Sequence, residues 1–293
     1  MKKIIKEVKG GIVQVTVADE RWYLKSQVDE KTKLPAYKGV PSVTWIAGFY
    51  PKGIQFYKWL AEKGWDESQA IKSAAGDKGS KVHYACEDIV AGKAVKMEDK
   101  YVNPSTGEEE ELTLEEYEAV LSFADWLKDM AEKFKDFEVV SSEEVVWNDE
   151  YGYAGTVDLA YRADGKLWIV DLKTGQYIWP EHKLQVSAYK HAYPADVSSL
   201  AILQLGYHRN QRLWKLTEVD DEFDLFLTAR KIWEKEVGDQ KPSVKDYPVE
   251  IQINVKWAKV AIVNKINGNG RSSKNSKGGG SDTGVKTGNR KSA

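Results

Sequence analysis

The stretch AGTVDLAYRADGKLWIVDLKTG, which spans Ala154–Gly175, decides how this chain folds. Two runs rich in β-branched and aromatic residues flank the pair Asp164-Gly165. An Asp-Gly pair between two such runs predicts a tight β-hairpin. Asp158 lies in the first run, and Asp171 and Lys173 lie at the end of the second. Charged side chains are costly in or beside a sheet core, so the position of these three residues needs an explanation.

The register of this hairpin brings two carboxylates together. Side chains alternate between the faces of a strand, so Asp171 and Lys173 point the same way, with about 6–7 Å between their Cα atoms. If Asp164-Gly165 forms the turn, Asp158 lies opposite Asp171, with about 5 Å between the two residues. Two carboxylates so placed repel each other, and burial increases the cost.

A divalent cation between Asp158 and Asp171 removes that cost, and oxygen ligands suit Mg²⁺ or Mn²⁺. Lys173, one pleat further along, can orient a water molecule or help to remove its proton, and it can screen charge on a phosphate. The pattern therefore favours metal-assisted hydrolysis of a phosphodiester. The alternative is an edge-strand ion pair between Asp171 and Lys173, with Asp158 facing solvent.

Two helical pairs accompany the hairpin. Gln185 and Tyr189, in KLQVSAYKHA, are spaced i, i+4 and share a face of a helix that follows the Asp171 strand. His83 and Glu87, in KGSKVHYACEDIVAG, have the same spacing on an earlier helix. A lone histidine on a helix is usually structural, so only the order of the surrounding motifs singles out His83.

Taken in order, these motifs resemble the PD-(D/E)xK nuclease superfamily in its RecB-like exonuclease branch. That branch has a histidine on an early helix, a G-x-x-D strand, a D-x-K strand and a Q-x-x-x-Y helix. The matching segments here are GSKVHYACE, GTVD, DLKTG and QVSAY, and the resemblance covers about residues 42–219. PSVTWI at 41–46 also resembles the phage-encoded members of this branch.

The resemblance implies an α/β fold, a restriction-endonuclease-like core with a mixed central β-sheet flanked by helices. It implies that Asp158 and Asp171 are metal ligands, that the carbonyl of Leu172 is a third ligand, and that His83 completes the shell. It assigns Lys173 to the attacking water.

The resemblance also implies that Gln185 and Tyr189 support the site or hold a DNA phosphate. Glu87 competes with His83 for the role of ligand on the early helix. Glu144, at the start of a predicted strand, is either a supporting acid or an exposed glutamate at a strand end.

The function implied is a Mg²⁺-dependent (or Mn²⁺-dependent) DNA exonuclease in phage or bacterial recombination or repair. DNA is the expected substrate, a single-strand annealing protein or a helicase is a possible partner, and the cytoplasm of a bacterial host cell is the expected location. Two alternatives stay open: a structure-specific endonuclease that uses the same site, and a DNA-binding recombination partner whose site is silent.

Composition limits the other functions. The 293 residues carry a formal net charge of −2, so no global attraction to nucleic acid or to an anionic membrane is expected. Cys86 is the only cysteine, which excludes an internal disulfide and an iron–sulfur cluster with four cysteine ligands. The sequence has no P-loop pattern and no apolar run of about 20 residues, so neither a helicase motor nor a membrane span is predicted.

Three parts are predicted along the chain: an N-terminal β-rich extension over 1–50, a nuclease core with helical additions over 51–265, and a disordered basic tail over 266–293. Strands are expected at 4–8, 12–17, 21–28, 41–46, 143–148, 153–163, 166–174, 199–208 and 212–219. Helices are expected within 54–92, at 112–137 with a Thr113/Glu116 capping box, from Pro180 and at 221–237.

Basic residues beside the predicted site form two groups that suit contacts with DNA phosphates and bases. Each residue taken singly is slightly better explained as an ordinary solvated side chain. The groups are Lys72, Lys78 and Lys81 before His83, and Tyr207, His208, Arg209 and Arg212 at a predicted hairpin.

Overall fold

The computed structural model of the chain describes residues 3–8, 11–17, 20–28 and 35–238. The tail predicted over 266–293 lies outside the described residues, and the core predicted over 51–265 is described as far as residue 238.

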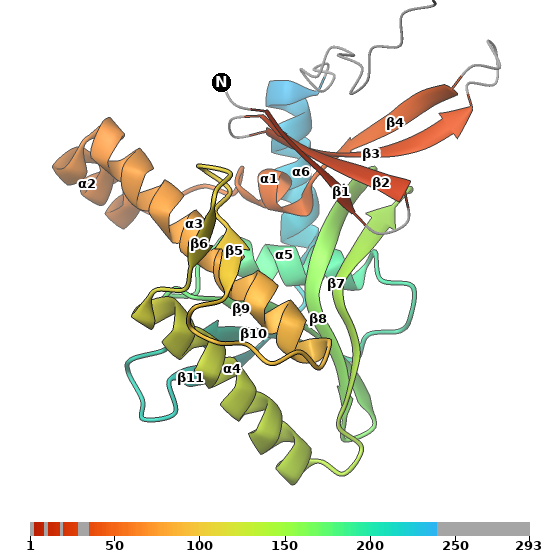
Figure 1. Cartoon of the computed structure of the whole chain (residues 1–293). Helices are drawn as coiled ribbons and strands as arrows, with labels where there is room; N and C mark the ends of the chain where they lie inside the picture. The colour runs from red at the N-terminus through yellow and green to blue at the C-terminus, as the bar shows by residue number, and fades with distance from the viewer. Residues whose placement is uncertain (1–2, 9–10, 18–19, 29–34, 239–293) are drawn as a thin grey trace, which may run out of the picture. The chain divides into compact units, whose positions relative to one another are not determined.

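A five-stranded sheet with the order β11-β10-β9-β8-β7 carries the fold (Figure 1). Strands β9 and β10 run parallel, and the other neighbours are antiparallel. The mixed sheet, flanked by helices, confirms the predicted fold class. Its strands are β7 (Glu138–Asn148), β8 (Tyr153–Ala163), β9 (Lys166–Lys173), β10 (Ser199–Leu205) and β11 (Trp214–Val219).

The hairpin between β8 and β9 forms as the sequence predicts. Asp164 and Gly165 have φ angles of 54° and 68°, the left-handed pair that a two-residue turn needs to match the twist of its strands. Pairing runs from Ala163–Lys166 to Leu159–Val170 in the predicted register.

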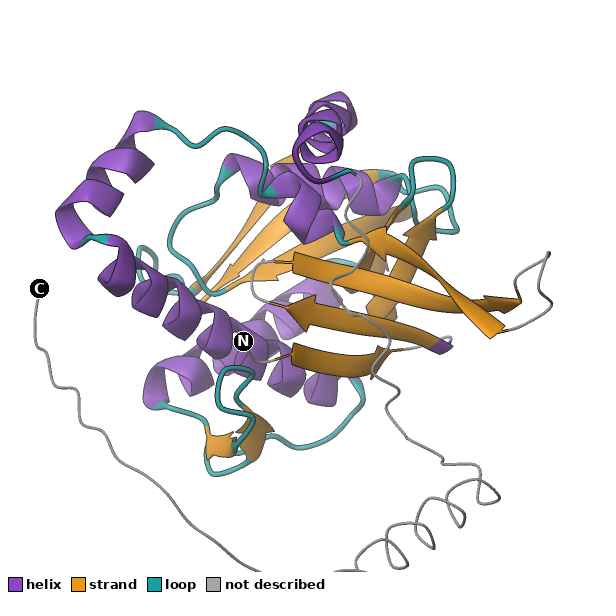
Figure 2. Cartoon of the chain, turned by 90° about the horizontal axis from the view of Figure 1, so that it is seen from above, coloured by secondary structure: helices purple, strands orange, loops and turns teal. Residues whose placement is uncertain are grey.

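Helices cover both faces of the sheet (Figure 2). On one face, α3 (Trp65–Val90) and α4 (Leu114–Lys133) share an apolar core with Val170 and Leu172 of β9. On the other face, α1 (Val43–Ala47), α5 (Pro180–Lys190) and α6 (Phe223–Val237) share a core with Leu167 and Ile169. The alternation predicted for β9 is thus confirmed, and Asp171 and Lys173 fall on the α5 side of the strand.

The N-terminal region forms a second, antiparallel sheet with the order β1-β2-β3-β4. Its strands are β1 (Lys3–Val8), β2 (Ile12–Val17), β3 (Glu20–Val28) and β4 (Pro35–Pro41). It packs against the start of β8: Ile12, Tyr23 and Val40 share a core with Ala154, and the Tyr23 and Thr156 hydroxyls lie 2.9 Å apart.

The strand predicted at 41–46 is wrong. The Oγ atom of Ser42 accepts a hydrogen bond from the backbone N–H of Trp45 at 3.0 Å, which starts α1 at Val43. A serine cap thus outweighs the β-branched content of this short segment.

The other predicted elements agree with the structure except at their ends, whereas β4, β5 and β6 were not predicted from the sequence. The helical region predicted over 54–92 contains α2 (Ile54–Lys63) and α3. Helix α4 has the predicted Thr113/Glu116 capping box but ends at Lys133. Strand β7 begins at Glu138, five residues before the predicted start, and β5 (Lys100–Val102) and β6 (Glu109–Glu111) form a small hairpin. Among the described residues, no helix is both long and apolar enough to span a membrane.

Candidate functional site

Three carboxylates lie at one level of the five-stranded sheet. Across β7 and β8, Ser142 pairs with Leu159 and Glu144 with Val157, so Glu143 lies opposite Asp158. Across β8 and β9, the last backbone pair is Leu159–Val170, and Asp158 and Asp171 are the next two residues in the same register. We refer to Glu143, Asp158 and Asp171 as the carboxylate row.

The strands change their pairing at the carboxylate row. Glu143 has a φ of 51°, a left-handed conformation that is unusual for a residue within a strand. The backbone N–H of Leu172 donates to Oδ2 of Asp158 at 2.7 Å, at the level where the backbone pairing between β8 and β9 has ended. The Asp158 side chain thus takes the place of a backbone acceptor for the Leu172 N–H group. This hydrogen bond holds the Asp158 carboxylate at the end of the paired part of the two strands.

The faces of β8 also change at this level. Val157 belongs to the core under α5, whereas Leu159 belongs to the core under α3 and α4. Residues two positions apart on a regular strand share one face, so the strand must rotate at Asp158. The rotation keeps Asp158 out of both apolar cores.

Helix α3 brings His83 to the same place. Its Nε2 atom lies 3.1 Å from the carbonyl oxygen of Leu172, and its Nδ1 atom lies 3.5 Å from Oδ1 of Asp158 and 3.9 Å from Oε1 of Glu143. His83, Glu143 and Asp158 each offer a ligand atom, and these atoms all lie within 4.8 Å of one another. The three side chains are half-buried, so they form a partly enclosed cluster of ligands that a cation could join.

Asp171 is the most deeply buried member of the row, with 2% of its surface exposed. Burial raises the pKa of Asp171 most strongly, and the negative charge of Asp158 raises it further. The Lys173 ammonium lowers it, and the resulting pKa is about 6. The Oδ2 atom of Asp171 is buried and forms an ion pair with the Lys173 ammonium, but the geometry of this contact is not that of a regular hydrogen bond.

This donor set fits a hard divalent cation. Asp171 is buried, and the neighbouring Asp158 charge adds to burial in raising its pKa even with the Lys173 ammonium beside it. Carboxylate and carbonyl oxygens, which make up most of this donor set, are the ligands that suit Mg²⁺ and Mn²⁺. The cluster of ligand atoms consists of His83, Glu143 and Asp158, and the predicted ligands Asp171 and Leu172 lie next to it.

Helix α5 closes the site from the other side. Gln185 and Tyr189 are both buried on this helix. Burial, followed by the charges of Asp171 and Asp158, raises the pKa of the Tyr189 phenol well above its ordinary value. The phenol therefore stays protonated near the carboxylate row.

Gly155 explains the glycine of the G-x-x-D pattern. A Cβ atom at this position would lie 2.6 Å from Cε1 of Tyr189 and 3.2 Å from Cγ2 of Val43. Real Cβ atoms do not approach another carbon so closely, so only glycine lets the Tyr189 ring pack against β8.

The sequence missed Glu143 and named its neighbour instead. Glu144 lies in the interior of β7, half-buried and opposite Val157, so it is not an exposed residue at a strand end. Neither Glu144 nor Glu87 belongs to the cluster of ligand atoms around His83 in the described part of the chain. Counting residues across the turn at 149–152 would have opposed Glu143 to Asp158.

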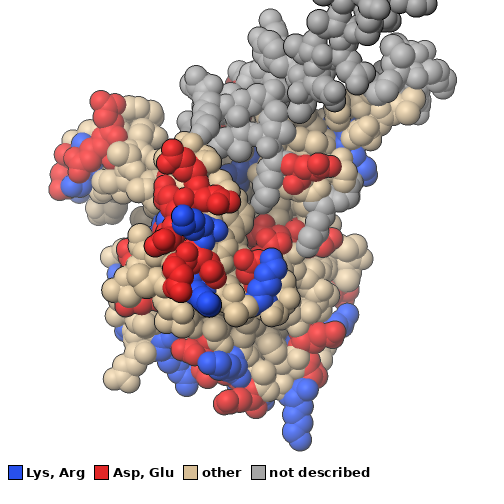
Figure 3. Space-filling model, in the orientation of Figure 1, with Lys and Arg blue, Asp and Glu red and all other residues tan. Residues whose placement is uncertain are grey.

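The basic residues before His83 do not form a common surface. Lys81 is buried and forms ion pairs with Glu116 at 3.0 Å and Glu110 at 3.2 Å, so its assignment as a possible DNA contact is corrected. Lys78 forms an ion pair with Glu115. On the face shown in Figure 3, the Lys and Arg side chains of the described residues are interspersed with Asp and Glu.

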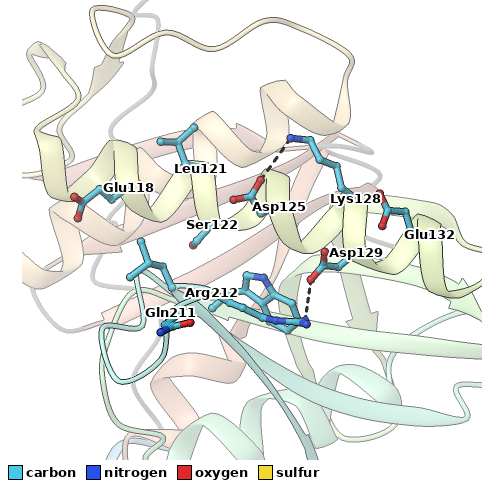
Figure 4. A pocket seen from close by; sticks show the side chains of 11 residues that line it. Glu118, Leu121, Ser122, Asp125, Lys128, Asp129, Glu132, Gln211 and Arg212 are labelled. Carbon is cyan, nitrogen blue, oxygen red and sulfur yellow. Dashed lines mark hydrogen bonds and ion pairs between the residues drawn. The ribbon is translucent and has the colours of Figure 1, made fainter.

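A separate pocket of about 430 Å³ lies between α4 and the segment 211–214 (Figure 4). Arg212 lines it and forms an ion pair with Asp129 at 2.9 Å. The α4 side of the pocket is rich in acid, which disfavours a DNA phosphate there. The acidic lining residues are Glu118, Asp125, Asp129 and Glu132.

The sequence was compared with family models, curated proteins and solved structures, and one family model matches it. A family model described as the PD-(D/E)XK nuclease superfamily matches residues 54–250. One solved structure, titled "Crystal structure of SSO0001", is similar at 14% identity with a TM-score of 0.30, over 55% of this chain and 84% of that one. No curated protein matches the chain. The matched range begins after the N-terminal sheet and contains every candidate residue from His83 to Tyr189.

Proposed function

Because this chain belongs to the PD-(D/E)XK nuclease superfamily, we propose that it is a Mg²⁺-dependent exonuclease that hydrolyses DNA from its ends. The observation that carries the proposal is the carboxylate row with His83 on one side and Lys173 on the other. Nuclease activity and DNA as substrate follow from the family; the metal, the mode of cleavage and the residue roles are proposed.

The ligands proposed for the cation are Asp158, Asp171, His83 and the carbonyl oxygen of Leu172, with Glu143 as an additional acid. When bound, Mg²⁺ supplies charge stabilisation for the phosphate and lowers the pKa of a water molecule. The backbone N–H of Leu172 holds the Asp158 carboxylate in place, because it donates to Oδ2 at 2.7 Å.

Lys173 is assigned to the attacking water. Its ammonium lies beside the Asp171 carboxylate, and its side chain keeps 23% of its surface exposed. It can therefore reach solvent while Asp171 holds it near the row. From there it donates hydrogen bonds to water and screens negative charge that develops on the phosphate. The protonated phenol of Tyr189 and the side chain of Gln185 support the row from α5.

Helices α2 and α3 favour cleavage from an end. No residue of α2 is buried, and between Trp65 and Ala75 of α3 only Ser68 is buried. Further along, α3 passes the site, because Gly79 lies against Thr174, the residue after Lys173. A projecting pair of helices beside the site limits the approach of continuous duplex DNA, so we assign it the role of restricting access to strand ends. Figure 1 shows α2 and the first half of α3 standing out from the sheet.

A role in phage or bacterial recombination or repair is also proposed. It is based on the ordered motifs that resemble the RecB-like branch, and a single-strand annealing protein or a helicase is the partner proposed with it. Such pathways consume duplex ends, which is the substrate that an end-restricted nuclease would process.

The test compares linear duplex with covalently closed circular duplex, with Mg²⁺ and then with excess EDTA. We expect progressive loss of linear DNA to short products, intact circles, and no cleavage in EDTA. Rapid nicking of closed circles that is lost in Asp158→Ala would establish an endonuclease instead. Binding of DNA without cleavage under any divalent cation would establish a silent site.

A further inference from the structure

The segment that follows the carboxylate row along β9 exposes two aromatic rings. Tyr177 is 59% exposed and Trp179 is 50% exposed, and both lie within six residues of Lys173. Their ring centroids are 6.1 Å apart with an interplanar angle of 39°. Most aromatic side chains of the described residues are buried or half-buried, so two exposed rings beside the candidate site point to a ligand.

Hydrogen bonds fix this segment to the sheet. Gln204 donates to the carbonyl of Gly175 at 2.9 Å, and Gln176 donates to the carbonyl of Gly206 at 2.8 Å. The backbone N–H of His208 donates to Oε1 of Gln176 at 3.2 Å. The rings are therefore presented by a held loop, and binding a planar ligand there costs little ordering of the backbone.

A positive charge accompanies the rings. The guanidinium of Arg209 lies 4.5 Å from the centroid of the Tyr177 ring, a cation–π contact that joins the segment after β9 to the segment after β10. Because β9 and β10 are parallel, both segments leave the same edge of the sheet. Lys215, at 5.6 Å from the Tyr207 ring, repeats the combination of cation and ring nearby.

We propose that Tyr177, Trp179 and Arg209 form a stacking platform for unpaired bases of a single DNA strand next to the bond that is cleaved. Exposed rings stack on bases of any sequence, and the guanidinium pairs with the backbone phosphate. Tyr177 is four residues beyond Lys173, so its Cα lies within about 14 Å of that of Lys173. The inference rests on the proposed nuclease function and names the form of its substrate, a single-stranded end or overhang.

The test measures binding separately from cleavage. The double variant Tyr177→Ala/Trp179→Ala is prepared in the wild-type and the Lys173→Ala chains, with Tyr37→Ala as control. Tyr37 is an exposed aromatic residue on β4 of the N-terminal sheet, which the platform does not include. Binding of a fluorescent mixed-sequence 12-nucleotide single strand is followed by anisotropy in EDTA, and thermal midpoints verify folding.

We expect the double variant to bind the single strand about 10- to 100-fold more weakly, since stacking contributes about 1–3 kcal/mol per base. Tyr37→Ala should bind as the wild type does. Arg209→Gln, which leaves both rings in place, should weaken binding and reduce the slope of log affinity against log salt by about 1. Wild-type affinity for the single strand in both platform variants, or no measurable binding by the wild type, would overturn the platform.

Cleavage of duplexes with and without a 3′ or 5′ single-stranded tail separates this inference from the nuclease proposal. If the variants lose single-strand binding but the wild type cleaves nothing with any divalent cation, the platform holds and the nuclease proposal fails. If tailed duplex is cleaved equally fast by wild type and double variant, the platform fails while the nuclease proposal holds.

Discussion

Two groups in this protein place a lysine against buried carboxylates, and they differ in how completely the charges are satisfied. One group consists of Lys81, Glu110 and Glu116, which join α3, β6 and α4. The other consists of Asp171 and Lys173 at the end of β9. The first is a structural ion cluster, and the second belongs to the candidate metal site.

The Lys81 cluster is fully partnered. The ammonium lies 3.0 Å from Glu116 and 3.2 Å from Glu110, and Oε2 of Glu116 also accepts the backbone N–H of Thr113 at 2.8 Å. Burial lowers the pKa of Lys81, but the hydrogen bonds that its ammonium donates to Glu116 and Glu110 outweigh burial, and the pKa is raised. The charged form of the lysine is therefore the stable one, and no further ligand is needed.

Asp171 has the opposite balance. Burial raises its pKa to about 6 even though Lys173 lies beside it, and the neighbouring Asp158 adds a further raising effect. Its charged form is poorly stabilised without a cation. A structural cluster thus satisfies its charges with protein groups, whereas the candidate site keeps negative charge that a metal ion would balance.

The largest expected effect is the loss of activity in Asp171→Asn. This change removes one negative ligand at nearly constant volume, and a Lewis-acid contribution of several kcal/mol corresponds to about 10³-fold in rate. Single-turnover cleavage of linear duplex measures the rate, and calorimetric titration with Mg²⁺ should show weaker binding. Unchanged metal affinity in this variant would remove Asp171 from the ligand set.

Breaking the Lys81 cluster should affect stability. Lys81→Met leaves Glu116 buried without its cation, so we expect the free energy of unfolding to fall by about 3–4 kcal/mol. Denaturant titration measures it. The double variant Lys81→Met/Glu116→Gln should recover part of the loss. Lys78→Met, which breaks the more exposed pair with Glu115, should cost about 1 kcal/mol or less. Equal losses in the two single variants would show that Lys81 is no more important than a surface lysine.

Lys173→Ala tests whether the second lysine serves chemistry. We expect a rate loss of about 10²-fold or more, comparable to removal of a positioned acid–base group, while Mg²⁺ affinity is mostly kept. The pair of variants at 171 and 173 thus separates metal binding from catalysis. A loss of metal affinity in Lys173→Ala as large as that in Asp171→Asn would contradict the role assigned to the lysine.

Packing of α5 on the row is tested by Gly155→Ala. The new Cβ would meet the Tyr189 ring at 2.6 Å, so we expect a loss of about 2 kcal/mol in stability together with a slower reaction. Gly76→Ala is the matched control. Gly76 lies within α3 with nothing within 4 Å of an added Cβ, and the change should stabilise the protein by about 0.5–1 kcal/mol. A neutral effect of Gly155→Ala would mean that Tyr189 moves aside freely.

The sequence predicted those features that depend on neighbouring residues in the chain. The Asp164-Gly165 turn fixes the hairpin register, and strand alternation places Asp171 and Lys173 on the α5 side. The features it missed depend on distant contacts or on backbone irregularity. Lys81 finds its partners 29 and 35 residues later in the chain, and Glu143 joins the row in a left-handed conformation within β7.

The smallest effect expected is the pH dependence of stability in the metal-free protein. The pKa of Asp171 is about 6 in the folded chain, against an ordinary value of 3.8. Between these values the folded protein keeps a proton that the unfolded chain has lost, so the contribution of Asp171 to stability falls as pH rises from about 4 to about 6.

Asp171→Asn lacks this titration. In EDTA it should unfold like the wild type near pH 4. At pH 7.5 it should be more stable by about 1–3 kcal/mol, and the ion pair with Lys173 is already included because it contributes to the pKa of about 6. Asp136→Asn is the control with the opposite sign, because backbone N–H groups of Gly165 and Asp164 lower the pKa of Asp136. That variant should be less stable than the wild type at pH 7.5, with a difference that disappears as the pH falls below about 4. A stability gain of Asp171→Asn that is the same at pH 4 and pH 7.5 would show that it does not arise from a buried negative charge.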